Sequence, residues 1–195
     1  MLKVGVTGGI GSGKSTVCNL FKCLEIPIFN ADLAGRNVLA TDLQVIKDVT
    51  SLFGEVIYIN GIPDRKKIAE LVFTDSKKLA KLNSIIHPAV RNKFDEWATE
   101  QKAPYIIYEA AIAFESGAYR QMNSTILVTA PEALRIKRIM QRDAMDEHAI
   151  LDRMKNQWSD SEKKKLADFV IYNDDITPVL LQVMDIHNRL ITQAR

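Results

Sequence analysis

The chain has 195 residues, of which 47% are apolar, and its 26 basic and 24 acidic residues give a formal net charge of +2. This length and apolar content allow one substantial α/β core with insertions, but not two full domains. The near balance of charge excludes the strong positive field typical of nucleic-acid binders, so we expect a small anionic partner and no nucleic acid. Because the N-terminus lacks a signal-peptide pattern and no apolar run reaches membrane-spanning length, the sequence predicts a cytoplasmic protein with no membrane contact.

A glycine-rich segment near the N-terminus, Gly8-Gly9-Ile10-Gly11-Ser12-Gly13-Lys14-Ser15, follows the apolar run 2–7. It fits the phosphate-binding pattern G-x-x-x-x-G-K-S. Glycines let successive backbone N–H groups face inward, and the lysine adds a positive charge beside the N-terminus of the next helix. The segment therefore predicts binding of a nucleoside triphosphate. The residues expected to hold its phosphates are Gly11, Ser12, Gly13, Lys14, Ser15 and Thr16.

Strand-like and helix-like patterns alternate along the rest of the chain, which predicts an α/β fold with a parallel sheet covered by helices. Strands are expected near 2–7, 26–29, 104–108, 124–129 and 168–171, with a helix over 15–24 after the phosphate-binding segment. Ligands of such sheets bind beyond the carboxyl ends of the strands. Candidate site residues therefore lie in the segments Asn30–Asp32, Glu109–Glu115 and Asn173–Asp175.

A long insertion separates the second and third predicted strands. It has roughly 70 residues, more than one crossover helix requires. We expect an inserted helical subdomain over 32–102. Its helices are predicted near 31–39, 42–53, 64–73, 76–86 and 88–102, with Pro88 separating the last two.

A second helical insertion is expected over 132–166, which leaves a core of 1–31, 103–131 and 167–195. The insertion is rich in cations. Its Lys163–Lys165 run is interpreted as a solvated helix face. Its arginines Arg138, Arg142 and Arg153 are different, because arginines on a mobile flap can neutralise charge that develops during phosphoryl transfer.

Two short matches to GTPase patterns also occur. Asp32-Leu33-Ala34-Gly35 fits D-x-x-G, and Asn92-Lys93-Phe94-Asp95 fits N-K-x-D. Asp32 follows Ser15 by only 17 positions, which a helix mostly occupies, so no room remains for a switch strand. The second match lies within a helical pattern. We interpret both as chance.

The chain resembles the dephospho-coenzyme A kinase family in an ordered series of motifs that covers most of its length. These motifs are residues 6–17, Asn30-Ala31-Asp32, His87-Pro88 at the close of an apolar helix, Phe114-Glu115, 138–143, 153–157 and 167–173. Two segments depart from the family, since Asn30 replaces the first aspartate of Asp-Ala-Asp and 109–115 replaces a Pro-Leu-Leu segment. The resemblance implies a P-loop NTPase three-layer fold with a five-stranded parallel sheet, an inserted helical substrate subdomain and a helical lid.

The resemblance further implies transfer of the ATP γ-phosphoryl group to the 3′-hydroxyl of the ribose in dephospho-coenzyme A. Such chemistry needs a phosphate cradle, a magnesium ligand, a carboxylate that orients the acceptor and cations over the transferring group. We expect Lys14 to bridge the β- and γ-phosphates, Asp32 to accept or orient the hydroxyl proton, and Arg142 to be the lid cation. Asp32 could alternatively be only the N-cap of a helix beginning near Leu33.

Magnesium and the adenine ring also have candidate contacts. The Ser15 hydroxyl is expected to bind Mg²⁺. Glu109 is either a carboxylate that supports the metal or a structural group that caps a turn. Asn173 is positioned to touch adenine, although turn formation also explains an asparagine there.

The acceptor is expected to contact His87, Glu115 and Arg138. His87 could instead simply belong to the helix break at Pro88, and Arg138 could share the lid role or pair with Asp143. Two other functions stay open: a different small-molecule kinase, such as a nucleoside monophosphate kinase, and a GTP-binding switch. We expect a monomer or a weak homo-oligomer.

Overall fold

The computed structural model describes residues 1–73 and 75–195; residue 74, within the predicted 32–102 insertion, lies outside the described residues. The chain divides into two compact units, one of residues 1–30 and 101–195 and the other of residues 31–100.

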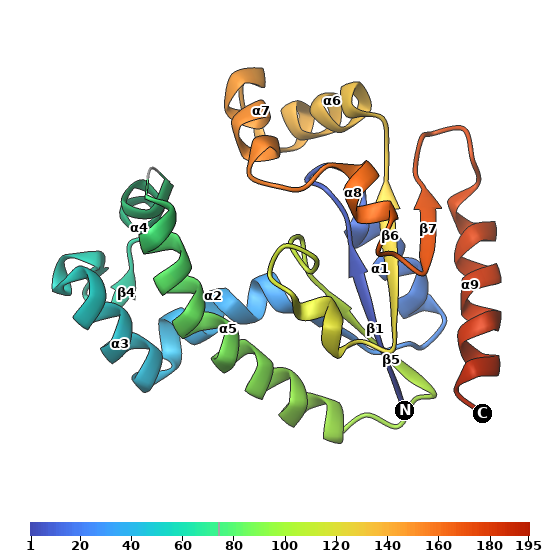
Figure 1. Cartoon of the computed structure of the whole chain (residues 1–195), viewed down its shortest axis with the longest axis horizontal. Helices are drawn as coiled ribbons and strands as arrows, with labels where there is room; N and C mark the ends of the chain where they lie inside the picture. The colour runs from blue at the N-terminus through green and yellow to red at the C-terminus, as the bar shows by residue number, and fades with distance from the viewer. Residues whose placement is uncertain (74) are drawn as a thin grey trace. The chain divides into compact units, whose positions relative to one another are not determined.

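The first unit is built on a five-stranded sheet with strand order β2-β5-β1-β6-β7 (Figure 1). All four strand pairs are parallel. The five predicted strands are confirmed, with small differences at their ends. They are β1 (Leu2–Thr7), β2 (Ile28–Asn30), β5 (Tyr105–Glu109), β6 (Ser124–Thr129) and β7 (Phe169–Tyr172).

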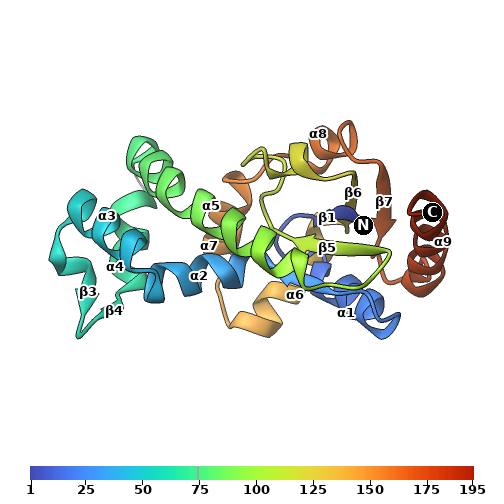
Figure 2. The same cartoon turned by 90° about the horizontal axis from the view of Figure 1, so that it is seen from below.

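Helices cover both faces of this sheet, which confirms the three-layer α/β fold. Figure 2 shows α1 (Lys14–Cys23) on one side of the strands and α8 (Asp160–Lys164) with the short 3-10 helix Ala118–Gln121 on the other. The C-terminal helix α9 (Val179–Gln193) packs against α1. The core combines apolar side chains of these helices with those of the strands, among them Val6, Val17, Phe21, Ile107, Ile126 and Leu190.

The strand register brings three carboxyl ends to one edge of the sheet. Asn30 of β2 lies opposite Glu109 of β5, and Glu109 lies opposite Val6 of β1. Thr7, the last residue of β1, is paired with Leu127 of β6. The phosphate-binding segment leaves β1 at this edge, so the fold places it beside the ends of β2 and β5.

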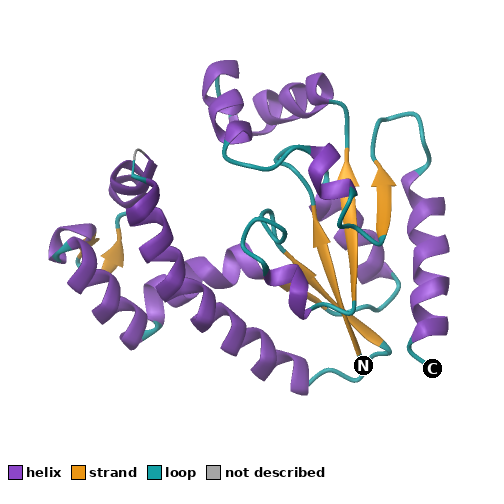
Figure 3. Cartoon of the chain, in the orientation of Figure 1, coloured by secondary structure: helices purple, strands orange, loops and turns teal. Residues whose placement is uncertain are grey.

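The second unit is mainly helical. It contains α2 (Ala31–Thr41), α3 (Leu43–Phe53), α4 (Arg65–Phe73) and α5 (Ser76–Thr99), with a 3-10 turn at Glu55–Ile57. A hairpin of β3 (Tyr58–Ile59) and β4 (Ile62–Pro63) was not expected from the sequence (Figure 3). Its turn is Asn60-Gly61, and both residues have positive φ, as a type I′ hairpin turn requires.

The predicted helix break at Pro88 is wrong, because α5 runs continuously from Ser76 to Thr99. A proline inside a helix removes one N–H donor and strains the preceding turn, but it does not force the chain to stop. Buried residues occur on both sides of Pro88, namely Leu82 before it and Val90, Phe94 and Ala98 after it. Packing of this apolar stripe against α2, α3 and α4 holds the helix together.

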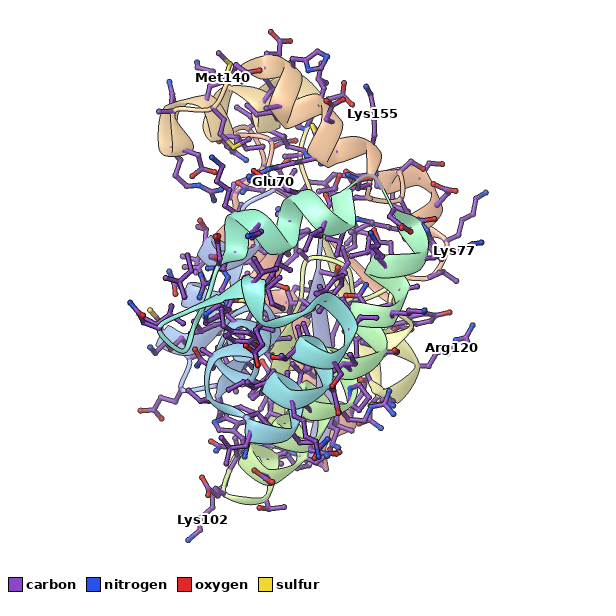
Figure 4. The ribbon with its side chains drawn as sticks, turned by 90° about the vertical axis from the view of Figure 1, so that its left-hand side faces the viewer. Glu70, Lys77, Lys102, Arg120, Met140 and Lys155 are labelled. Carbon is purple, nitrogen blue, oxygen red and sulfur yellow. The ribbon has the colours of Figure 1, made fainter. Side chains whose placement is uncertain are left out.

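Residues 132–166 are mainly helical, as expected. They form α6 (Glu132–Asp143), α7 (Glu147–Lys155) and α8, whose N-terminus carries a capping box of Ser159 and Glu162. Figure 4 shows Met140 of α6 and Lys155 of α7 on the outer surface of this segment. Within residues 1–73 and 75–195, no helix combines the length and apolarity that crossing a membrane requires.

Candidate active site

The phosphate-binding segment forms a compact loop between β1 and α1. Gly13 caps the start of α1 with φ of 90°, and Gly11 has φ of 78°, a region that favours glycine. The Ser12 N–H donates to the Gly9 carbonyl at 3.1 Å. Because α1 buries Val17, Cys18 and Phe21 in the core, the helix N-terminus is fixed at the edge of the sheet.

The Lys14 ammonium folds back over this loop. Its Nζ donates to the Gly8 carbonyl at 2.8 Å and to the Gly9 carbonyl at 3.4 Å. The charge therefore lies at the mouth of the loop, beside the N–H groups at the start of α1. This combination of a fixed cation and a helix N-terminus is suited to binding a phosphate chain.

A hydrogen-bonded triad joins the ends of α1, β2 and β5. The Ser15 hydroxyl donates to Glu109 Oε1 at 3.0 Å, and Asn30 Nδ2 donates to Glu109 Oε2 at 2.9 Å. Glu109 is 7% exposed, so both oxygens of a nearly buried carboxylate receive a donor. The triad places hydroxyl and carboxylate oxygens, which Mg²⁺ prefers, directly beside the phosphate-binding loop.

Asn173 contacts the loop from the end of β7. Its Nδ2 donates to the Ser12 carbonyl at 2.8 Å, and its backbone N–H donates to the Thr129 carbonyl at 2.8 Å. A Cβ at Gly13 would lie 2.0 Å from this Nδ2, and the φ of 90° at this position also favours glycine. Asn173 therefore supports the loop, a contact that the sequence did not indicate.

The predicted lid arginines have different partners. Arg138 Nη1 donates to the Asn173 carbonyl at 3.1 Å, and Nη2 pairs with Asp175. Asp143 pairs instead with Arg142, whose Nε and Nη2 donate to its two oxygens at 2.7 and 2.8 Å, so the suggested pairing of Arg138 with Asp143 is wrong. This hydrogen bonding raises the pKa of Arg142 and lowers that of Asp143. The Arg142 side chain is 66% exposed.

Two side chains that the sequence reasoning left without a role contact the loop directly. Arg135 Nε donates to the Ile10 carbonyl at 2.9 Å, and Gln157 Oε1 accepts from the Ile10 N–H at 2.9 Å. The sequence did contain a signal that Arg135 faces inward, because it lies four residues before the buried Ile139 and so shares its helix face. Gln157 belongs to the motif at 153–157, which marked its position but not its contact.

Glu115 is engaged within the protein. Its Oε1 accepts from the Trp158 N–H at 2.9 Å and lies 3.0 Å from Lys163 Nζ. Lys163 is fully buried, so the interpretation of Lys163–Lys165 as a solvated face is wrong at this position, although Lys164 and Lys165 are exposed. A buried ammonium requires a counter-charge, and Glu115 supplies it. Glu115 thereby ties α8 to the loop after β5.

Two predicted residues belong to the second unit. Asp32 is exposed in the first turn of α2, where a carboxylate interacts favourably with the helix dipole. Since α2 begins at Ala31, the alternative in which Asp32 caps a helix starting near Leu33 is wrong. His87 lies half-buried in α5, and burial, with the nearby Arg91 charge, lowers its pKa.

Comparison with known proteins identifies the family. A sequence model described as dephospho-CoA kinase matches residues 2–178. The dephospho-CoA kinase of Bacteroides fragilis is 36% identical over 186 residues, which cover 95% of this chain and 91% of the relative. Among solved structures, a protein of Thermus thermophilus matches with a TM-score of 0.86 and 30% identity, covering 98% of this chain and 97% of that one.

A second solved structure, the dephospho-CoA kinase from Campylobacter jejuni, matches with a TM-score of 0.69 and 28% identity, covering 99% of this chain and 98% of that chain. The family match spans both compact units and the loop, triad and helices described above. The chain belongs to the dephospho-CoA kinase family.

Proposed function

We propose that this protein transfers the γ-phosphoryl group of ATP to the 3′-hydroxyl of the dephospho-CoA ribose, giving CoA and ADP. The observation that carries the proposal is the loop at residues 8–15, with Lys14 over its mouth, in a chain that matches the family along residues 2–178. Family membership also makes the protein an ATP-dependent phosphotransferase with an alcohol acceptor.

The phosphate loop and the triad have complementary roles in this proposal. Backbone N–H groups of residues 11–16 cradle the phosphates, and Lys14 bridges the β- and γ-phosphates. Mg²⁺, where bound, neutralises phosphate charge. The Ser15 hydroxyl would be its protein ligand, and Glu109, which accepts a hydrogen bond from that hydroxyl, would orient it.

The remaining assignments concern the acceptor and the lid. Asp32, two residues beyond Asn30 of the triad, orients the acceptor hydroxyl and receives its proton. Arg142 leaves Asp143 to neutralise charge on the transferring group, since its exposed pairing is weak. His87, Glu115 and Arg138 stay predictions as acceptor contacts. Asn173 stays a prediction as an adenine contact.

The larger parts of the chain are assigned accordingly. Residues 32–102 form the subdomain that selects the acceptor, and residues 132–166 form the lid. We infer a cytoplasmic enzyme that is a monomer or a weak homo-oligomer.

The alternatives have little support. Family membership disfavours a nucleoside monophosphate kinase. The two GTPase-like matches both fall inside helices, Asp32–Gly35 in α2 and Asn92–Asp95 in α5, where neither can form a nucleotide-binding loop.

The proposal is tested by measuring ATP consumption with dephospho-CoA, AMP, CMP or no acceptor, side by side, and by identifying the products by mass spectrometry. We expect dephospho-CoA to be the preferred acceptor and the product to carry one added phosphoryl group. Faster turnover of AMP or CMP would favour a monophosphate kinase. GTP-specific binding with slow hydrolysis and no acceptor would favour the switch.

A further inference from the structure

The peptide groups that flank Ile10 are held from both sides by residues of the 132–166 segment. The carbonyl of Ile10 accepts from Arg135 Nε of α6, and its N–H donates to Gln157, which follows α7. Ile10 is in the middle of the phosphate-binding loop. The loop is therefore fixed by side chains more than a hundred positions away in the sequence.

Arg135 is the more unusual of these two partners. It is 8% exposed, and a buried guanidinium is stable only when its charge is compensated. Asp160 of α8 supplies the counter-charge, with its Oδ1 at 3.6 Å from Arg135 Nη1. This Oδ1 is buried and has no hydrogen-bond partner in the described part of the chain, so the arginine is what compensates it.

Asp160 is itself fixed to the sheet. Its Oδ2 accepts from Thr129 Oγ1 at the end of β6. The same helix, α8, is tied to the loop after β5 by the buried pair of Lys163 and Glu115. A continuous set of contacts thus runs from the sheet through Asp160 to Arg135 and on to Ile10.

The guanidinium of Arg135 packs directly against the backbone of the phosphate-binding loop. A Cβ built on Gly9 would lie 2.1 Å from Arg135 Nη2, so the guanidinium occupies the space that any side chain at position 9 would need. A Cβ on Gly11 would lie 2.7 Å from the Arg135 carbonyl. The loop backbone and α6 are therefore fitted to each other around the arginine.

We propose that Arg135 is a positioning residue for ATP binding. It holds the Ile10 carbonyl so that the backbone N–H groups after Ile10 converge on the phosphates. Through its ion pair with Asp160 it also fixes the loop relative to α8. The proposal rests on the proposed function, because it concerns the ATP half of that reaction. It assigns Arg135 no contact with the acceptor.

The first test compares Arg135→Gln with Lys137→Gln, a matched loss of charge at an exposed site on the same helix. We expect Arg135→Gln to raise KM for ATP about tenfold to a hundredfold, the range for losing a hydrogen bond from a charged donor. KM for dephospho-CoA should change less than about twofold. Arg135→Lys, which keeps the charge but loses the planar geometry of the guanidinium, should restore part of the ATP affinity.

The second test uses the packing of Gly9. Gly9→Ala should weaken ATP binding in the native background, because the new methyl group displaces the guanidinium. In an Arg135→Ala background that space is empty, so Gly9→Ala should add less than about a twofold loss. Mg·ATP binding is measured by titration calorimetry without acceptor, and circular dichroism checks that each variant is folded.

The outcomes separate this proposal from the proposed function. If the native protein does not phosphorylate dephospho-CoA but Arg135→Gln still weakens ATP binding, only the acceptor assignment fails. The positioning role is overturned if Arg135→Gln binds ATP as Lys137→Gln does. It is also overturned if Gly9→Ala has the same cost in both backgrounds. A lower melting temperature with unchanged KM for ATP would mean a purely structural arginine, and would overturn it too.

Discussion

At the scale of single residues, the proposed chemistry depends on one carboxylate, Asp32. Asp32→Asn removes the charge while keeping the size of the side chain. We expect kcat to fall by about a hundredfold, within the range for loss of a positioned base. Affinity for ATP should be unchanged, because Lys14 and the loop are intact. Steady-state kinetics at saturating Mg·ATP measure the effect; a normal kcat would leave Asp32 with only its interaction with the dipole of α2.

Asn30 gives a pH-dependent prediction. Its amide donates to Glu109 at 2.9 Å, so Asn30→Asp would replace a donor with a second carboxylate at that distance. Repulsion raises the pKa of the introduced carboxyl above the unfolded value of about 3.9. Because the pKa is raised on folding, the introduced carboxyl stays protonated to a higher pH in the folded state than in the unfolded state. The free energy of unfolding therefore falls as pH rises through the folded pKa.

Melting temperature, recorded from pH 4 to pH 8 without divalent cations, tests this expectation. The deficit of Asn30→Asp relative to the native protein should grow with pH, and Mg²⁺ should reduce it. Asn19→Asp, at an exposed position of α1, is the matched control and should show little change. A deficit that does not vary with pH would contradict the prediction.

At the scale of elements, the buried pair of Lys163 and Glu115 anchors α8. Lys163→Met would leave the Glu115 carboxylate without its counter-charge, which costs about 3 kcal/mol of unfolding free energy. The exposed neighbour provides the comparison, since Lys165→Met should change stability by less than about 0.5 kcal/mol. Urea unfolding measures both variants. Equal midpoints would mean that the pair does not anchor the helix.

The C-terminal end of α6 carries the proposed lid cation. Arg142→Ala should lower kcat by about tenfold or more, as expected for losing an electrostatic donor, and should leave KM for dephospho-CoA nearly unchanged. Arg142→Lys should recover only part of the native kcat, because the planar guanidinium fork is lost. Rapid-quench kinetics isolate the chemical step. A normal rate in Arg142→Ala would move the role to Arg138.

Sequence patterns predicted some elements better than others, for physical reasons. The strands were predictable because short apolar runs such as 105–108 and 125–128 are covered on both faces. The phosphate-binding loop was predictable because this spacing of glycines and Lys14 is rarely explained by structural needs other than phosphate binding. The burial of Lys163 was not predictable, because the lysine run has the same sequence whether or not one of its ammonium groups pairs with a carboxylate distant in the chain. The continuity of α5 through Pro88 depends on tertiary packing, which local propensity does not contain.

At the scale of the whole molecule, ATP binding should stabilise the folded chain. At a free ATP concentration of about 100 times its Kd, the gain is about 2.7 kcal/mol. Thermal denaturation with Mg·ATP should therefore shift upward in the native protein and much less in Lys14→Ala, whose melting temperature without nucleotide should be native-like. An equal shift in both proteins would argue against a role for Lys14 in holding phosphate. The chain has two compact units. If they unfold in separate thermal transitions, the shift of each transition with Mg·ATP is a further readout.

The contacts of the loop have a consequence for synthesis of the protein. Ser12 is joined to Asn173 across 161 positions, and Ile10 to Gln157 across 147. The loop leaves the ribosome among the first residues, yet the side chains that hold it are translated close to the end. A nascent chain arrested before residue 157 carries the whole glycine-rich sequence without those two supports. We therefore expect such ribosome-bound fragments to bind ATP weakly, and affinity to rise only when release is nearly complete.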